Sequence, residues 1–237
     1  MLILNKVHKI VIGIMVCMTI TNITAQESGI NFEVNLGTTP TSPLKLFHNS
    51  LKDQVDFENF KTTDNFYYNY GFSVGFSVEN IKSSFFYANR VSGAKSSVAD
   101  YSGHFRLTNE LKGSTIGYRY YLNLVSNEKS HLYAQFKGLV TFSSFNITSD
   151  LTTSGTNQFD SLDFKSIDYG LGGGLLYEYP LGFLVLRAYI DLDLYYGGRI
   201  KLKEDNPDGG YLLNENGDKL TTGWSGLTVG MGFTIPM

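Results

Sequence analysis

The residues of this chain that could do chemistry are few and widely spaced. Three of its four histidines, His48, His104 and His131, lie in polar loops or at a turn. Their spacing matches no metal site, because zinc ligands recur at short, regular intervals. Ser102, His104 and a loop aspartate could form a hydrolytic trio, yet such residues meet by chance in polar loops. The histidines and serines therefore predict no catalytic residue, no cofactor and no metal.

Two acidic, turn-rich stretches, 205–210 and 214–218, superficially suggest a calcium site. They lack the ligand spacing of an EF-hand loop. Asn, Asp, Pro and Gly at these positions are typical of hairpin turns, because they tolerate the backbone conformations that turns require. We therefore interpret this region as turns.

A further set of charged side chains alternates with apolar ones along predicted strands. Because buried charges must be paired or hydrogen-bonded, we expect a polar network inside the fold. Glu33, Arg119, Lys137 and Arg187 fall at one depth, and we expect Glu33 to contact Arg119 or Arg187. A structural role is favoured, and a gate or proton path is the alternative. The predicted network comprises Glu33, Arg119, Lys137, Asp168, Glu178, Arg187, Asp191 and Asp193.

Eight stretches alternate apolar residues with polar or tiny ones, which is the period of a β-strand with one apolar face. In the last of them, Leu227, Val229 and Met231 alternate with Gly and Thr. The phase of the third stretch is ambiguous because Phe85 and Phe86 are adjacent. The predicted strands are 30–37, 67–78, 83–91, 113–122, 131–142, 166–179, 183–196 and 226–235.

The connections between these strands alternate in length. Long polar segments cover 38–65, 92–112, 143–164 and 197–223, and short turns cover 79–82, 123–130 and 180–182. Bacterial outer-membrane barrels have an even number of strands, short periplasmic turns and long extracellular loops. The sequence thus predicts an all-β, eight-stranded antiparallel up-and-down transmembrane barrel with four long extracellular loops, three short periplasmic turns and periplasmic termini. A soluble lipid-carrying barrel is the alternative, but it would need an apolar interior and a polar exterior.

Tyrosines gather at the predicted strand ends, as expected of the aromatic belts at membrane interfaces. The predicted outer girdle contains Tyr67, Tyr68, Tyr70, Tyr195 and Tyr196. The predicted inner girdle contains Tyr120, Tyr121, Tyr177 and Tyr179.

The interior of an eight-stranded barrel is just wide enough for side chains. Segment 183–196 directs Phe183, Val185, Arg187, Tyr189 and Tyr195 inward, and its two neighbours present mostly Gly and Thr. Large side chains can cover bare glycine backbone on the adjacent strand. We therefore expect a plugged interior rather than a diffusion pore.

The N-terminus has Lys6 and Lys9, an apolar run and a small residue at Ala25. This pattern is typical of a secretory signal peptide, predicted as 1–25, with the barrel domain as 26–237. Cleavage would remove Cys17, the single cysteine, so packing or lipid must stabilise the chain. The remainder has no run long enough for a membrane helix. The net charge of the full chain, −3, does not suggest a nucleic-acid partner.

The segments 116–121, 171–174 and 230–233, with Ala25-Gln26, resemble the eight-stranded outer-membrane barrels of the OmpA/OmpX type. The chain is most similar to the Bacteroidota outer membrane protein beta-barrel domain group, which includes PorT-like proteins. It departs from that pattern because Phe233 is not terminal but is followed by Thr234-Ile235-Pro236-Met237. The resemblance implies outer-membrane lipid and the barrel-insertion machinery as partners.

The resulting expectation is a non-enzymatic outer-membrane protein that acts through its loops. Adhesion, docking of an extracellular protein or glycan, and envelope integrity are the roles that fit. Alternatives are an outer-membrane enzyme with an active site at the rim and an accessory protein of a secretion system.

Overall fold

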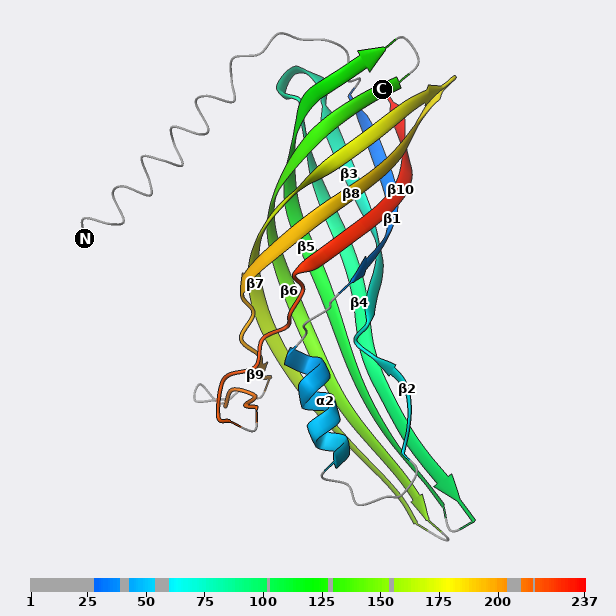
Figure 1. The fold of residues 1–237 in the computed structure, drawn as a ribbon, viewed down its shortest axis with the longest axis vertical. Helices are drawn as coiled ribbons and strands as arrows, with labels where there is room; N and C mark the ends of the chain where they lie inside the picture. The colour runs from blue at the N-terminus through cyan, green and yellow to red at the C-terminus, as the bar shows by residue number, and fades with distance from the viewer. Residues whose placement is uncertain are drawn as a thin grey trace, which may run out of the picture.

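The computed structural model describes residues 28–38, 43–53, 60–101, 103–127, 130–153, 156–203, 210–214 and 216–237. The predicted signal peptide, Ser102 and most of the acidic stretch 205–210 lie outside these residues. Eight long strands close into a ring (Figure 1). They are β1 (Gly29–Thr38), β3 (Tyr68–Val78), β4 (Ser83–Asp100), β5 (Gly103–Asn127), β6 (Ser130–Thr153), β7 (Thr156–Leu181), β8 (Leu184–Gly197) and β10 (Gly226–Pro236).

Antiparallel pairing runs around the whole ring. β1 pairs with both β3 and β10, and β4 pairs with both β3 and β5, so the barrel has no open seam. The predicted all-β, eight-stranded antiparallel barrel is confirmed. Four smaller elements complete the described chain: α2 (Pro43–Asp53), β2 (Lys61–Asn65), the 3-10 turn η1 (Glu79–Ile81) and β9 (Lys201–Leu202).

The strand period determines which side chains face outward. In β1, the exposed residues Phe32, Val34 and Leu36 alternate with the buried residues Glu33 and Asn35. The register places Phe32 opposite Phe233 of β10, with ring centroids 5.4 Å apart on the outer face. The same alternation on the other strands gives the barrel an apolar outer surface and a polar interior.

Four strands are much longer than predicted. Segments 92–112 and 143–164, which we expected to be polar loops, continue the pairing of β4 with β5 and of β6 with β7. In these segments the outward-facing side chains become polar, and apolar ones such as Leu107, Leu111 and Phe145 lie on the inner face, so a search that follows the outer apolar stripe misses them. Together with β2, residues 92–112 and 143–165 form a sheet that extends past the barrel (Figure 1), which we call the blade.

The blade orders its strands β2-β4-β5-β6-β7. Residues 61–65 of β2 pair with the outer part of β4, with a register shift between Thr62 and Asp64. On the opposite edge, β9 pairs with β7 only at Phe164 and Lys165.

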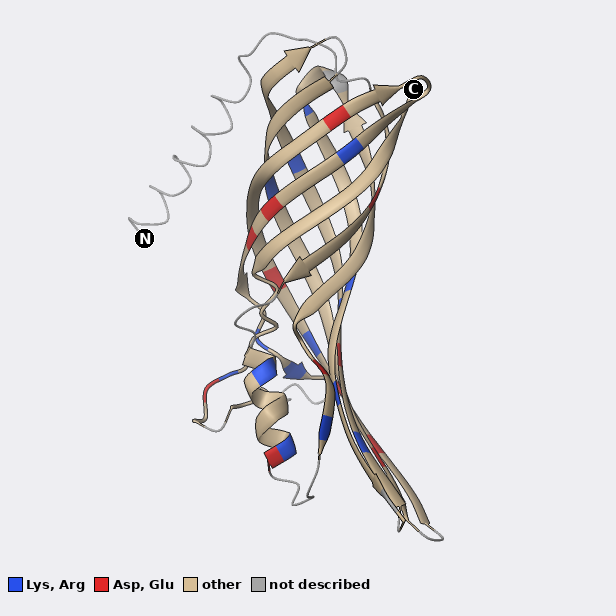
Figure 2. Ribbon diagram, turned by 45° about the vertical axis from the view of Figure 1, so that its right-hand side comes forward, with Lys and Arg blue, Asp and Glu red and all other residues tan. Residues whose placement is uncertain are grey.

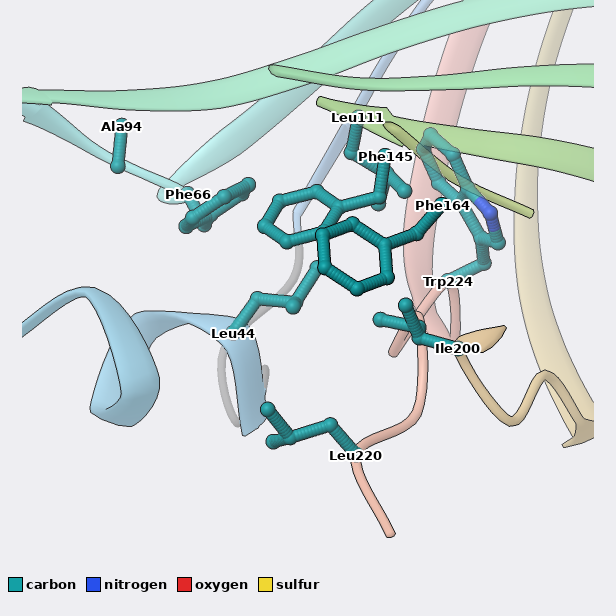
Figure 3. Packing of buried hydrophobic residues seen from close by; sticks show 9 residues of the cluster. All are labelled: Leu44, Phe66, Ala94, Leu111, Phe145, Phe164, Ile200, Leu220 and Trp224. Atoms are coloured by element: carbon teal, nitrogen blue, oxygen red, sulfur yellow. The ribbon is translucent and has the colours of Figure 1, made fainter. Parts of the chain in front are cut away.

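An apolar core fills the junction between barrel and blade (Figure 3). Leu44 of α2 and Trp224, which precedes β10, are buried in it together with Phe145 and Phe164 of the blade. The other members are Phe66, Ala94, Leu111, Ile200 and Leu220. Burying such a side chain stabilises the fold by roughly 1.5–3 kcal/mol. We call this cluster the mouth core, and it was not predicted, because we expected segments 38–65 and 197–223 to be polar loops.

The prediction that Phe183 points into the barrel is wrong. Phe183 is 80% exposed, because it belongs to the tight turn between β7 and β8 and not to the barrel wall. Gly182 of the same turn has φ of 61°, a conformation that favours glycine.

Candidate functional site: the barrel interior and its mouth

Charged residues occur on several barrel strands (Figure 2), and those of the predicted network are at most 5% exposed. Arg119 of β5 contacts Glu33 of β1 through two hydrogen bonds, Nη1 to Oε1 at 2.8 Å and Nη2 to Oε2 at 3.0 Å. Ser73 of β3 donates a third hydrogen bond to Glu33 at 2.9 Å. Such bidentate, charge-assisted pairs are the strong kind. These contacts cross the lumen between strands that are not adjacent in the ring, because β3 and β4 separate β1 from β5.

Arg187 of β8 extends the same cluster. Its Nη1 lies 3.3 Å from Glu33 Oε1, and its Nε lies 3.2 Å from Glu178 Oε1. Its Nη2 donates to the Tyr121 hydroxyl at 2.9 Å, and that hydroxyl lies 2.8 Å from Ser84 Oγ. We call this set, with Arg119 and Ser73, the Glu33 cluster.

A second cluster surrounds Lys137 of β6. Its Nζ lies 2.8 Å from Asp191 Oδ2 and 2.7 Å from Asp193 Oδ1. Gln135 also donates to Asp191, and Arg90 donates to Asp193 Oδ2 at 3.1 Å. We call this set the Lys137 cluster. The structure thus separates Lys137 from the contacts that Glu33 makes.

Arg90 was missed by the sequence analysis. It lies in the segment whose phase was ambiguous, and β4 directs Phe86, Ala88 and Arg90 inward. Gly117 could have indicated which residues of the segment 83–91 face inward. A methyl group at Gly117 would overlap the Phe86 ring, so the two positions pack together on the inner face.

Asp168 lies apart from both clusters. Its carboxylate accepts hydrogen bonds from Ser143 at 3.0 Å and from Thr222 at 2.5 Å. The Trp224 indole donates to the same Ser143 at 2.9 Å, which ties the polar interior to the mouth core. Among the described residues, no Lys or Arg forms a salt bridge with Asp168.

Aromatic rings occupy much of the remaining lumen. A methyl group at Gly230 would overlap the Tyr189 ring, and one at Gly170 would lie 2.8 Å from the Tyr195 ring. Tyr121, Tyr133, Tyr189 and Leu176 form a buried apolar cluster next to the Glu33 cluster. These rings and the two charged clusters therefore fill the lumen.

The tyrosines predicted for the girdles differ in which face of their strand they occupy. Tyr68, Tyr70, Tyr177, Tyr179 and Tyr196 are exposed on the outer surface, and Tyr120 is half-buried. Tyr121 is fully buried and Tyr195 packs against the mouth core, so both were wrongly assigned to the girdles. Adjacent residues within a strand point to opposite faces, so Tyr120 and Tyr121 cannot both face outward, and neither can Tyr195 and Tyr196. Tyr67 is also exposed, but it precedes β3.

A hydrolytic trio of Ser102, His104 and a loop aspartate was not predicted from the sequence. His104 lies 3.6 Å from Asp150 on the polar face of the blade, and Ser102 lies outside the described residues. Instead, Ser96 Oγ lies 2.8 Å from His48 Nε2, and Asn109 Nδ2 lies 3.0 Å from His48 Nδ1. This order of groups is that of a hydrolase, but all three side chains are 0% exposed and the imidazole is carried by α2. Lifting α2 would separate the histidine from the serine, so these contacts act as a latch between α2 and the blade.

The environment of His48 disfavours the charged imidazole. Burial, and secondarily the positive charge of Lys52, lower the pKa of His48 to about 4. At neutral pH the latch is therefore made by a neutral ring.

Within the described residues, no group of His, Cys, Asp and Glu is arranged to hold a metal ion, and no helix is long and apolar enough to span a membrane.

No protein-family model matches this chain, and no curated protein matches it. Among solved structures, it is similar to the crystal structure of Neisserial surface protein A (NspA), at 10% sequence identity and a TM-score of 0.36. The match covers 90% of this chain and 100% of that one. A likeness this weak identifies neither a family nor a function.

Proposed function

We propose that this chain is an integral outer-membrane β-barrel protein with a closed interior, which presents the blade outside the cell as a docking surface. The observation that carries the proposal is the polarity of the closed ring. All eight strands direct large apolar residues outward, and two charged clusters lie inside. A closed barrel satisfies its backbone hydrogen bonds internally, as hydrocarbon requires.

The same polarity argues against a soluble lipid carrier. Such a protein needs an apolar cavity and a polar exterior, whereas here Glu33, Arg119 and Arg187 are inside and residues such as Phe72, Ile116 and Leu171 are outside. Exposing this outer surface to water would leave a very large apolar area unburied.

Strand length supports a position across the membrane. A tilted β-strand crosses a bilayer with about 9–11 residues. β1 and β10 have 10 and 11 residues, which matches a single crossing. β5, β6 and β7 have 25, 24 and 26 residues, so each is long enough to cross the bilayer once and to continue beyond it into the blade.

The orientation follows from the two ends of the barrel. Met237 N donates to Ser28 O at 2.8 Å, so both ends of the described chain lie together at the end with the short turns. The blade, α2 and β9 lie at the other end (Figure 1). Short turns face the periplasm in bacterial barrels, which supports periplasmic termini and an external blade.

The role we favour is non-enzymatic. The filled lumen supports neither a pore nor a transport path, and the Ser96–His48 pair is closed to substrate. The blade is then the part of the protein that carries the function, through adhesion, partner docking or envelope integrity. An accessory role in secretion would use the same surface.

Cysteine labelling tests the proposal directly, because Cys17 in the predicted leader is the chain's single cysteine. Tyr101→Cys sits at the β4–β5 tip, and Leu181→Cys sits at a short turn as the matched control. In intact cells, an impermeant maleimide should label Tyr101→Cys and not Leu181→Cys, and only detergent should extract the protein from envelopes. Extraction without detergent, or labelling of both positions, would refute the proposal.

A further inference from the structure

The outer edge of the blade is an open strand. From Thr156 to Asp163, β7 pairs with β6 on one side. On its other side, β9 pairs with β7 only at Phe164 and Lys165, and Lys203 N donates to Asp163 O at 2.9 Å. Beyond that hydrogen bond, none of the residues that the structure describes pairs with this edge, and residues 156–163 are all exposed.

The direction of the backbone groups along this edge follows from one hydrogen bond. Because Asp163 O faces β9, both backbone groups of Asp163 point away from β6. The pattern repeats every second residue, so the N–H and C=O of Ser161, Phe159 and Asn157 also point to the open side. A row of unpaired donors and acceptors of this kind is a template for another strand.

Apart from its two aspartates, the edge lacks the usual devices that prevent such pairing. Edges are commonly protected by charged side chains, above all Lys, by Pro or by a β-bulge. Residues 156–163 contain no Pro and no Lys, and their register with β6 is unbroken. Phe159 is 67% exposed and Leu162 is 52% exposed, on opposite faces of the strand.

Charge indicates what kind of strand would fit. Residues 143–163 carry Asp150, Asp160 and Asp163 and no Lys or Arg. Lys61 and Lys95 lie on the far strands of the blade, and Lys165, Lys201 and Lys203 lie at one end of the open stretch, where β9 meets β7, so the stretch 156–163 itself carries only negative charge. Opposite charges on adjacent strands are favourable and like charges are not.

We propose that the β7 edge binds an extended, basic segment of a partner protein, which adds to the blade as one more antiparallel or parallel strand. The proposal rests on the proposed function, since it requires the blade to be accessible outside the membrane. The segment would be about six to eight residues long. It would carry Lys or Arg beside Asp160 and Asp163, and apolar residues beside Phe159 and Leu162.

A second copy of this chain is a poorer occupant. Pairing of two β7 edges about a two-fold axis would bring Asp160 and Asp163 of both copies into the same short stretch of sheet. Like charges at this spacing are destabilising.

The test uses the full-length protein in detergent and a synthetic peptide of about eight residues with paired lysines and valines, which places both residue types on both faces. We expect the peptide to bind, and versions with Glu for Lys or with N-methylated backbone to fail. Asp160→Asn with Asp163→Asn should weaken binding roughly fivefold to tenfold. The matched control Asp64→Asn, on the opposite edge strand β2, should leave binding unchanged.

Phe159→Pro removes one outward N–H without touching the β6 ladder, and should weaken binding about tenfold. Should this variant fold poorly, amide exchange on the unmodified protein replaces it: the peptide should protect the amides of Asn157, Phe159 and Ser161. Absence of peptide binding, equal loss in Asp64→Asn, or protection elsewhere would overturn the proposal. Labelling of Tyr101→Cys reports blade exposure independently, so failure of the edge and failure of the proposed function are distinguishable.

Discussion

Glu33 of β1 and Arg119 of β5 lie on strands that are not neighbours in the barrel and meet inside it through two hydrogen bonds of 2.8 and 3.0 Å. Both side chains are buried, and Arg187, which also pairs with Glu178, approaches the same carboxylate at 3.3 Å. Glu33 therefore pairs with two arginines, and its removal should destabilise the fold more than the loss of any single hydrogen bond.

Replacement of Glu33 tests this directly. Glu33→Gln would leave Arg119 and Arg187 without their shared counter-charge, and breaking a buried pair costs about 3–5 kcal/mol. We expect a matching fall in the free energy of unfolding, measured by urea titration of the heat-modifiable gel shift in lipid vesicles. Ser73→Ala removes only one hydrogen bond to the same carboxylate and should cost about 1 kcal/mol. Equal stabilities for Glu33→Gln and the unmodified protein would contradict the network.

The Lys137 cluster predicts a ranking of two variants. Lys137→Met would leave both Asp191 and Asp193 without Lys137, whereas Arg90→Met would leave Asp193 still paired with Lys137. We expect a loss of about 3–5 kcal/mol for the first and a clearly smaller loss for the second. Unfolding in urea measures both, and the reverse order would show that Arg90 is the main counter-charge.

The mouth core can be followed through the single tryptophan, Trp224, which is 2% exposed. Leu44→Ala should loosen α2 at a local cost of about 2–5 kcal/mol and increase quenching of tryptophan fluorescence by acrylamide. Leu46→Ala is the matched control, because Leu46 lies on the same helix but is 73% exposed. Quenching that rises equally in both variants would mean that α2 does not seal the core.

The latch between α2 and the blade should weaken in acid. The pKa of His48 is lowered to about 4 in the folded protein, against 6.5 ordinarily, so the detached state binds more protons between these values. The stabilisation that the neutral His48 ring gives to the docked α2 is complete above pH 6.5 and is lost as the pH falls toward 4. At about 1.4 kcal/mol per pKa unit it amounts to roughly 3 kcal/mol. Acrylamide quenching of Trp224 should rise over this range, and His48→Gln should abolish that dependence.

The filled lumen predicts no general permeability. Tyr189 and Tyr195 cover glycines of neighbouring strands, and two salt-bridged clusters cross the interior. Liposomes containing the protein should not swell in small sugars. Swelling comparable to that produced by a porin would show that the interior opens.

Much of the barrel could be predicted because an apolar–polar alternation with a period of two residues indicates a strand with one apolar face and one polar face. Phe32 and Glu33 illustrate this, since neighbouring residues on a strand must face opposite sides. Among the barrel strands, the prediction of which residues face inward failed where Phe85 and Phe86 are adjacent, and the inward-facing Arg90 was missed there.

Two parts of the candidate site could not be predicted from the pattern. The blade continues strands without an apolar outer stripe, so its residues resemble loops in sequence. The mouth core brings Leu44, Phe145 and Trp224 together from segments far apart in the chain, and nothing local to any of them specifies those neighbours.

The sequence by itself determined the class of fold and the two faces of its wall, because strand periodicity is a local property of the backbone. Tertiary structure alone decided the partners. Glu33 meets Arg119 because ring closure directs side chains of β1 and β5 into one lumen, and His48 meets Ser96 because α2 packs against the blade. The open edge of β7 was likewise decided by the fold, since whether a strand has a second neighbour depends on where every other strand lies.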